Sequence, residues 1–150
     1  PENAHVIPSL LLKVHRAKRE GSPYVDLWGT GKPFREFLHS HDLARALCLL
    51  LELSEIEYSG LLSDVPLINV GHGSDISIRA LAETIAEVVG YEGELRFDAT
   101  KPDGTPRKLL DSSRIFSLGW KPQISLREGL KETYNGVLGT LDSFVSSRVG

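Results

Sequence analysis

Segments of helical and strand-like periodicity alternate along the chain, and this alternation constrains the fold more than any other feature. Helical spacing of apolar residues covers 6–17, 40–54, 77–90 and 125–138. Strand-like runs cover 24–28, 34–38, 67–70 and 94–97. The segments 55–65 and 101–108 have the composition of loops. Because helices and strands that take turns are typical of α/β folds, we expect an α/β fold.

The clearest helix lies between Ser77, a good N-cap residue, and Gly90, a good helix terminator. Its apolar stripe consists of Ile78, Leu81, Ala82, Ile85, Val88 and Val89. A capping box of Ser125 and Glu128 predicts the start of the last helix, which we expect to end near Leu138.

Composition limits the classes of function. The 150 residues, 41% of them apolar, suit one domain over 1–138 with a fraying tail over 139–150. A net charge of −3 argues against a nucleic-acid-binding domain, and the apolar run at 47–51 is far too short to cross a membrane. The single cysteine, Cys48, cannot form an intrachain disulfide, which favours a cytoplasmic protein. Because Cys48 lies among leucines, we expect its thiol to be buried and inert.

Two glycine-rich turns could suggest nucleotide binding, but both lack the full fingerprint. Gly29-Thr30-Gly31 and Gly71-His72-Gly73 each miss the third glycine of a dinucleotide-binding loop. A P-loop is also missing from the sequence. The chain therefore carries no self-contained nucleotide-binding signature.

Cationic residues gather beside the loops rather than on one helix face. Lys32 and Arg35 flank the first glycine turn, and Lys101, Arg107 and Lys108 flank the second loop. Such cations suit an anionic small ligand, above all a diphosphate. The alternative is solvated loop charge without a ligand.

Histidines offer two further candidates. His39 and His41, with His72, could bind a metal, but Ser40 and Asp42 stand where a helix begins and suit its free amide groups. We favour capping and expect no metal site.

His5 stands at the start of the first helix. It is either an exposed histidine without a role or a general acid or base.

Four stretches together resemble the GDP-L-fucose synthase family, a group of extended short-chain dehydrogenase/reductases. They are residues 3–8 (Asn-Ala-His-Val-Ile-Pro), 28–39 (Trp-Gly-Thr-Gly-Lys-Pro-Phe-Arg-Glu-Phe-Leu-His), 68–71 (Ile-Asn-Val-Gly) and 97–111, which contains Lys-Pro-Asp-Gly-Thr-Pro-Arg-Lys. The last stretch and the first are the most specific. The resemblance extends to about Leu138 and implies the C-terminal, substrate-binding portion of such an enzyme.

The resemblance also implies what the rest of the enzyme supplies. The N-terminal Rossmann half, with its glycine-rich NADP(H) loop, catalytic Ser and Cys, and Tyr-x-x-x-Lys pair, is expected upstream of Pro1. Neither Tyr24 nor Tyr91 has a lysine four residues later. The intact enzyme is expected to be a homodimer that binds a GDP-sugar.

Roles for individual residues follow from the resemblance alone. It implies that His5 is the acid in epimerisation and lies close to the nicotinamide. It implies substrate contacts for Lys13, Trp28 and Arg35, and places Lys101 and Asp103 in a loop that closes over the nucleotide. The implied reaction inverts carbons 3 and 5 of GDP-4-keto-6-deoxy-D-mannose and then reduces its 4-keto group.

Two rival interpretations stay open. One is another nucleotide-sugar enzyme of the extended family, such as a 4-epimerase or a 4,6-dehydratase, against which the 101–108 loop argues. The other is a nucleotide-sugar-binding module without catalysis, which the missing cofactor fingerprint allows.

Overall fold

The chain folds into two compact units, which we describe separately. The computed structural model describes residues 5–62 and 66–146. The first unit comprises 1–33, 77–106 and 127–150, and the second comprises 34–76 and 107–126. Helices and strands mix in both, so the expected α/β class is confirmed. None of the helices within the described ranges has the length and apolar character that crossing a bilayer requires.

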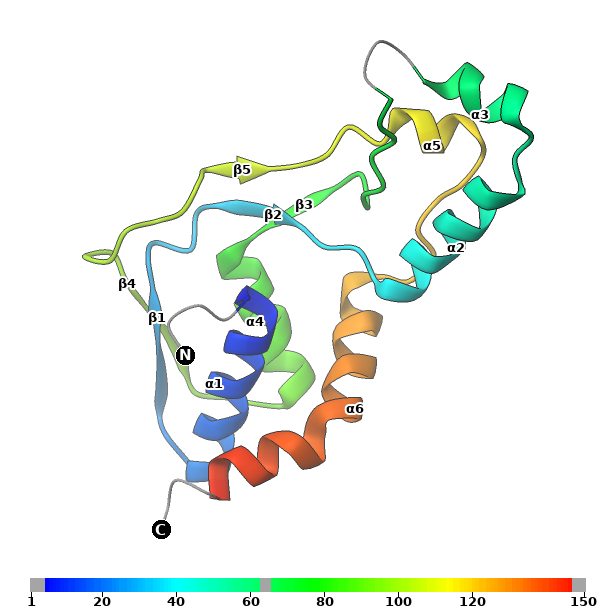
Figure 1. Cartoon of the computed structure of the whole chain (residues 1–150). Coiled ribbons are helices and arrows are strands. Elements are labelled where there is room, and N and C mark those ends of the chain that lie inside the picture. The colour runs from blue at the N-terminus through cyan, green and yellow to red at the C-terminus, as the bar shows by residue number, and fades with distance from the viewer. Residues whose placement is uncertain (1–4, 63–65, 147–150) are drawn as a thin grey trace. The chain divides into compact units, whose positions relative to one another are not determined.

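The first unit is built on two parallel strands. β1 (Tyr24–Trp28) pairs with β4 (Glu94–Asp98) in register from Tyr24↔Glu94 to Trp28↔Asp98. α1 (Val6–Glu20) and α4 (Ile78–Val89) pack against each other beside this pair (Figure 1). α6 (Leu126–Ser146) completes the unit.

Apolar side chains from these helices and from β1 form the core of the first unit. Its most deeply buried members are Leu11, Val14, Leu27, Leu81, Ala82, Ile85, Val89 and Leu130. Side chains along β1 point alternately to the two faces of the strand pair, so Val25 and Leu27 are buried and Trp28 lies at the surface. The helix expected over 77–90 is confirmed, because the Ser77 hydroxyl accepts the Ala80 amide at 3.1 Å and Gly90 adopts the left-handed conformation at φ 71°.

The second unit contains short strands and three helices. Its sheet has the order β3-β2-β5, formed by β3 (Asp75–Ser77), β2 (Phe34–Glu36) and β5 (Arg107–Lys108). Its helices are α2 (Ser40–Glu52), α3 (Glu55–Leu61) and α5 (Ser113–Ser117). Ala46, Ile115 and Trp120 form its core.

Several sequence-based expectations about local structure are wrong. Residues 55–61 form α3 rather than a loop, because Ser54 and Glu57 make a capping box. The 67–70 segment forms no strand, since the Leu67 carbonyl accepts a side-chain bond from Arg114 at 2.7 Å instead of joining a ladder. Cys48 is exposed, because α2 has apolar residues on more than one face and another face packs on the core.

The fourth difference concerns the last helix. α6 continues past Leu138 to Ser146, with Leu141 and Val145 buried. Residues 147–150 of the expected tail lie outside the described residues.

The expected cap of α2 is also corrected. Ser40 is the first helical residue, and His39 occupies the cap position, where its Nδ1 accepts the His41 amide at 3.3 Å. The Asp42 carboxylate does not cap its own helix. It is fully buried and accepts the amides of Gln123 at 3.0 Å and Ile124 at 2.9 Å.

Asp42 therefore anchors the chain that leads out of the second unit. Burial by itself raises the pKa of Asp42, but the amide bonds from Ile124 and Gln123 and the charge of Arg45 outweigh it and leave the pKa lowered. Arg45 donates to Asp42 at 2.6 Å, so the buried charge is paired.

We expect Asp42→Asn to lower the free energy of unfolding by about 2–4 kcal/mol at pH 7, because a neutral amide cannot accept all of these bonds. Since the folded-state pKa lies below the unfolded value of about 3.9, the carboxylate stabilises the fold above that pH. The difference in unfolding free energy between Asp42→Asn and the wild type should shrink as the pH falls through the folded-state pKa of Asp42. Urea unfolding at several pH values measures it, with the exposed Glu52→Gln on the same helix as the control. Equal losses in both variants would contradict this role.

A buried histidine ties α1 to α6 in the first unit. His15 is 1% exposed, and its Nδ1 lies 3.0 Å from the Tyr134 hydroxyl. Its Nε2 lies 3.3 Å from Oδ1 of Asp142. Burial, and next the Asp142 charge, raise the pKa of Tyr134, so the phenol stays protonated at neutral pH.

Replacing Tyr134 by Phe should cost about 1–2 kcal/mol in unfolding free energy, because a buried nitrogen of His15 loses its partner. Tyr58→Phe on the surface of α3 is the matched control and should change stability by less than about 0.5 kcal/mol. Urea unfolding distinguishes the two outcomes. If Tyr134→Phe is as stable as the control, the hydroxyl does not hold α6 to α1.

Candidate functional site

The candidate site in the first unit lies where β1 and β4 end. Trp28 is the last residue of β1 and Asp98 is the last residue of β4, and the two are register partners. In open parallel sheets, ligands bind outside the carboxyl ends of the strands. Trp28 is 64% exposed there, although its ring is one of the largest apolar side chains in the chain.

Two further residues from the sequence-based set join Trp28 at this edge. The Lys101 ammonium lies 5.7 Å from the centroid of the Trp28 ring, within the range of a cation–π contact. The Asp103 carboxylate accepts the Thr30 amide at 2.8 Å and the Thr30 hydroxyl at 2.6 Å. The structure thus brings Trp28, Lys101 and Asp103 together from segments far apart in the sequence.

The carboxylates at this edge remain charged. The hydroxyl and then the amide of Thr30 lower the pKa of Asp103, with a smaller contribution from the charge of Lys32. Bonds from Thr100 lower the pKa of Asp98 in the same way. Hydrogen bonds from donors favour the ionised form, so both groups are anions at neutral pH.

Lys13 lies on α1, and His5 lies at the start of this helix. The Lys13 ammonium is exposed and donates to the Asp26 carbonyl at 3.1 Å. An ammonium has three donors, so it can still bind an anion. His5 is exposed at the cap position, and its carbonyl accepts the Ser9 amide at 3.1 Å while its imidazole makes no cap bond.

Arg35 belongs to the second unit. It lies on β2 in register with Lys108 on β5, so two cations neighbour each other across this pair. Its guanidinium donates to the Phe34 carbonyl at 2.6 Å.

Arg107, another cation beside the loop, is committed elsewhere in the second unit. Its guanidinium forks onto Asp75, with distances of 2.5 and 3.0 Å. The Asp75 charge therefore offsets that of Arg107.

Sequence reasoning missed Thr30 and Arg79. Thr30 is the partner of Asp103, and the Arg79 guanidinium donates to the Thr30 carbonyl at 3.3 Å while it stacks over Phe97. The signal in the sequence was the pair of glycines that flank Thr30. Both have positive φ, 82° at Gly29 and 75° at Gly31, so the turn between them presents Thr30 in a fixed orientation.

The glycine turns do not form an open cradle for a cofactor phosphate. Added Cβ atoms would meet Asp103 at Gly29, Phe97 at Gly31 and Phe116 at Gly73, so protein side chains already occupy these spaces. A dinucleotide phosphate needs exposed amides at such a turn. The described residues therefore do not fit a dinucleotide phosphate at these turns.

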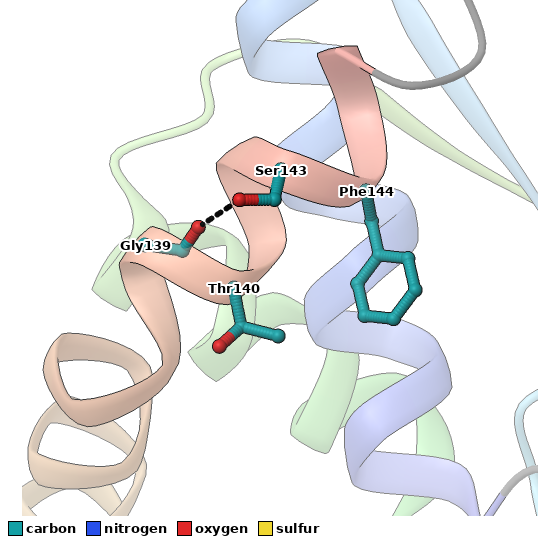
Figure 2. A pocket seen from close by; sticks show the side chains of 4 residues that line it. All are labelled: Gly139, Thr140, Ser143 and Phe144. Carbon is teal, nitrogen blue, oxygen red and sulfur yellow. Dashed lines mark hydrogen bonds between the residues drawn. The ribbon is translucent and has the colours of Figure 1, made fainter.

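A separate hollow lies on α6 in the first unit. Figure 2 shows its lining, Gly139, Thr140, Ser143 and Phe144, with the Ser143 hydroxyl bonded to the Gly139 carbonyl at 2.9 Å. None of these side chains titrates, and none belongs to the expected site. This hollow offers no acid, base or charged ligand.

Comparisons with known proteins show what the chain is similar to. The NAD dependent epimerase/dehydratase family matches residues 1–60. GDP-L-fucose synthase 1 of Arabidopsis thaliana is 54% identical over 138 residues, which are 92% of this chain and 40% of that protein. GDP-L-fucose synthase of Escherichia coli (strain K12) is 50% identical over 145 residues, covering 96% of this chain and 45% of that protein.

Solved structures give the same result. A GDP-L-fucose synthetase from Naegleria fowleri superposes with a TM-score of 0.79 at 28% identity, over 94% of this chain and 41% of that one. The chain thus spans about 40% of the length of the relatives it matches. On sequence and fold together, the chain is similar over most of its length to GDP-L-fucose synthases, and its residues 1–60 match the NAD dependent epimerase/dehydratase family.

Proposed function

We propose that this chain is the C-terminal, GDP-sugar-recognising portion of an NADPH-dependent GDP-L-fucose synthase. The whole enzyme would convert GDP-4-keto-6-deoxy-D-mannose to GDP-L-fucose in the cytoplasm, as a homodimer. The similarity to GDP-L-fucose synthases supports the class of enzyme. The observation that carries the role of this chain is the exposed Trp28 ring with the Lys101 ammonium beside it.

The proposed ligand contacts follow from the chemistry of these side chains. An aromatic face packs against a flat or ring-shaped group, and ammonium and guanidinium groups bind diphosphate oxygens. Trp28 would therefore pack on the nucleotide sugar, and Lys13 and Lys101 would contact its anionic portion. Arg35 of the second unit is proposed as a substrate contact on the resemblance to GDP-L-fucose synthases. Asp103 belongs to the loop that carries Lys101 and would cover the nucleotide.

His5 is the proposed acid in epimerisation. An imidazole donates and accepts protons near neutral pH, and His5 is exposed at the start of α1, where a keto-sugar can approach it. The Cys expected in the N-terminal half would act as the base that removes the proton from carbon 3 or carbon 5, and this imidazole would return a proton to the opposite face, which inverts that carbon.

The cofactor is proposed to bind elsewhere in the enzyme. NADPH supplies the hydride that reduces the 4-keto group. Because the glycine turns of this chain are filled, the N-terminal half would hold NADP(H), with His5 next to the nicotinamide.

His5→Asn should slow proton exchange at carbons 3 and 5, because an amide cannot donate the proton. General acid catalysis typically contributes a factor of about 100 or more, and we expect a loss of that order. The measurement is deuterium uptake from solvent into the keto-sugar, in an enzyme that contains this chain and its cofactor-binding half. His72→Asn is the control. Exchange at the wild-type rate in His5→Asn would remove His5 from the reaction.

Arg35→Ala should weaken GDP-mannose binding about tenfold or more, the size expected for one lost charge-assisted bond. Calorimetric titration of the chain with GDP-mannose measures this, with Arg127→Ala on α6 as the control. A parallel titration with UDP-glucose tests whether the chain prefers a guanine or a uracil nucleotide. An unchanged dissociation constant would exclude Arg35, and preference for UDP-glucose would overturn the proposed substrate class.

A further inference from the structure

The loop after β4 is fastened at its first end by Asp98. The Asp98 carbonyl accepts the amides of Gly29 at 3.0 Å and Lys101 at 3.1 Å. Its carboxylate accepts the Thr100 amide at 3.0 Å and the Thr100 hydroxyl at 2.6 Å. These bonds turn the chain sharply at the end of β4 and join it to the residue that follows β1.

The second end of the loop is fastened by Asp103. Both of its carboxylate oxygens bond to one residue, Thr30, through the amide at 2.8 Å and the hydroxyl at 2.6 Å. The hydroxyl oxygen of Thr30 also accepts a hydrogen bond from the Lys32 amide at 3.1 Å, so the orientation of the hydroxyl is determined. A carboxylate that accepts two such bonds makes a strong contact.

Glycine at position 29 makes this contact possible. A Cβ atom at this position would collide with Oδ1 of Asp103, and the backbone has φ +82°. Any other residue would push the Asp103 carboxylate away from the Thr30 amide.

Lys101 is held between these two fastened ends. Its ammonium lies 5.7 Å from the centroid of the Trp28 ring. A lysine on a loose loop loses much conformational freedom when it binds an anion, and a loop fixed in advance reduces that cost. Neither oxygen of Asp103 needs a ligand, since Thr30 already bonds to both.

We propose that Asp103 is a positioning residue that fastens the 99–103 loop to Thr30 and thereby holds Lys101 over Trp28 to receive the diphosphate of the nucleotide sugar. The identity of this ligand rests on the proposed function. The fastening itself rests on the contacts of Asp103, Thr30 and Gly29 alone.

The test compares Thr30→Val, which removes the hydroxyl at nearly constant volume, with Thr30→Ser, which restores it. Thr30→Val should weaken GDP-mannose binding about threefold to tenfold in calorimetric titrations, and Thr30→Ser should recover the wild-type affinity. The effect should vanish in a Lys101→Ala background, because the fastening acts through Lys101. An equal effect with and without Lys101, or none at all, would overturn the positioning role.

A second measurement does not depend on ligand binding. In Asp103→Ala the Thr30 amide loses its acceptor, so hydrogen exchange of the Thr30 and Lys101 amides should become faster, while that of buried Ile85 in α4 stays unchanged. Unchanged exchange at Thr30 would overturn the fastening. If the wild-type chain binds no GDP-sugar, the proposed function fails, and this exchange measurement still decides the inference.

Discussion

The parallel pairing of β1 with β4 determines which side chains can form the candidate site. These strands are far apart in the sequence, and their register places Trp28 opposite Asp98. The segments that follow β1 and β4 then leave the strand pair at the same edge. The residues that follow, Thr30 on one side and Lys101 and Asp103 on the other, can bond only because the strands end together.

The charged side chains at this edge have two different kinds of surroundings. Asp98 and Asp103 are anions whose charge is met by amides and hydroxyls of the same unit. The Lys101 ammonium lies beside the aromatic face of Trp28, and its charge also contributes to lowering the pKa of the Asp98 carboxyl. The same distinction applies in the second unit, where Asp75 engages Arg107.

Local signals in the sequence predicted α4 well because its cap, stripe and terminator all lie within 77–90. They could not predict the partners of Asp42, which lie about 80 residues away at Gln123 and Ile124. Helical spacing likewise could not show which face of α2 packs on the core, so Cys48 was misplaced. Local sequence patterns can predict helices and strands, but contacts between segments that are distant in the sequence become visible only in the folded structure.

The candidate site shows the same division. The resemblance to GDP-L-fucose synthases implied substrate contacts for Lys13, Trp28 and Arg35 and a closing loop with Lys101 and Asp103. Of these residues, the fold places Trp28, Lys101 and Asp103 at one edge of the first unit. Thr30 escaped notice because a threonine between two glycines looks like an ordinary turn residue. Its role depends on Asp103, a bond across 73 positions of the sequence.

The indole resonances of the two tryptophans provide the most direct test of the central claim, that the Trp28–Lys101 pair receives a nucleotide sugar. Trp28 is exposed at the edge of the first unit, and Trp120 is 5% exposed in the core of the second. In a nitrogen–proton NMR titration with GDP-mannose, the Trp28 indole signal should shift with saturation and the Trp120 signal should stay in place. A saturable titration that leaves the Trp28 signal unmoved would contradict the account.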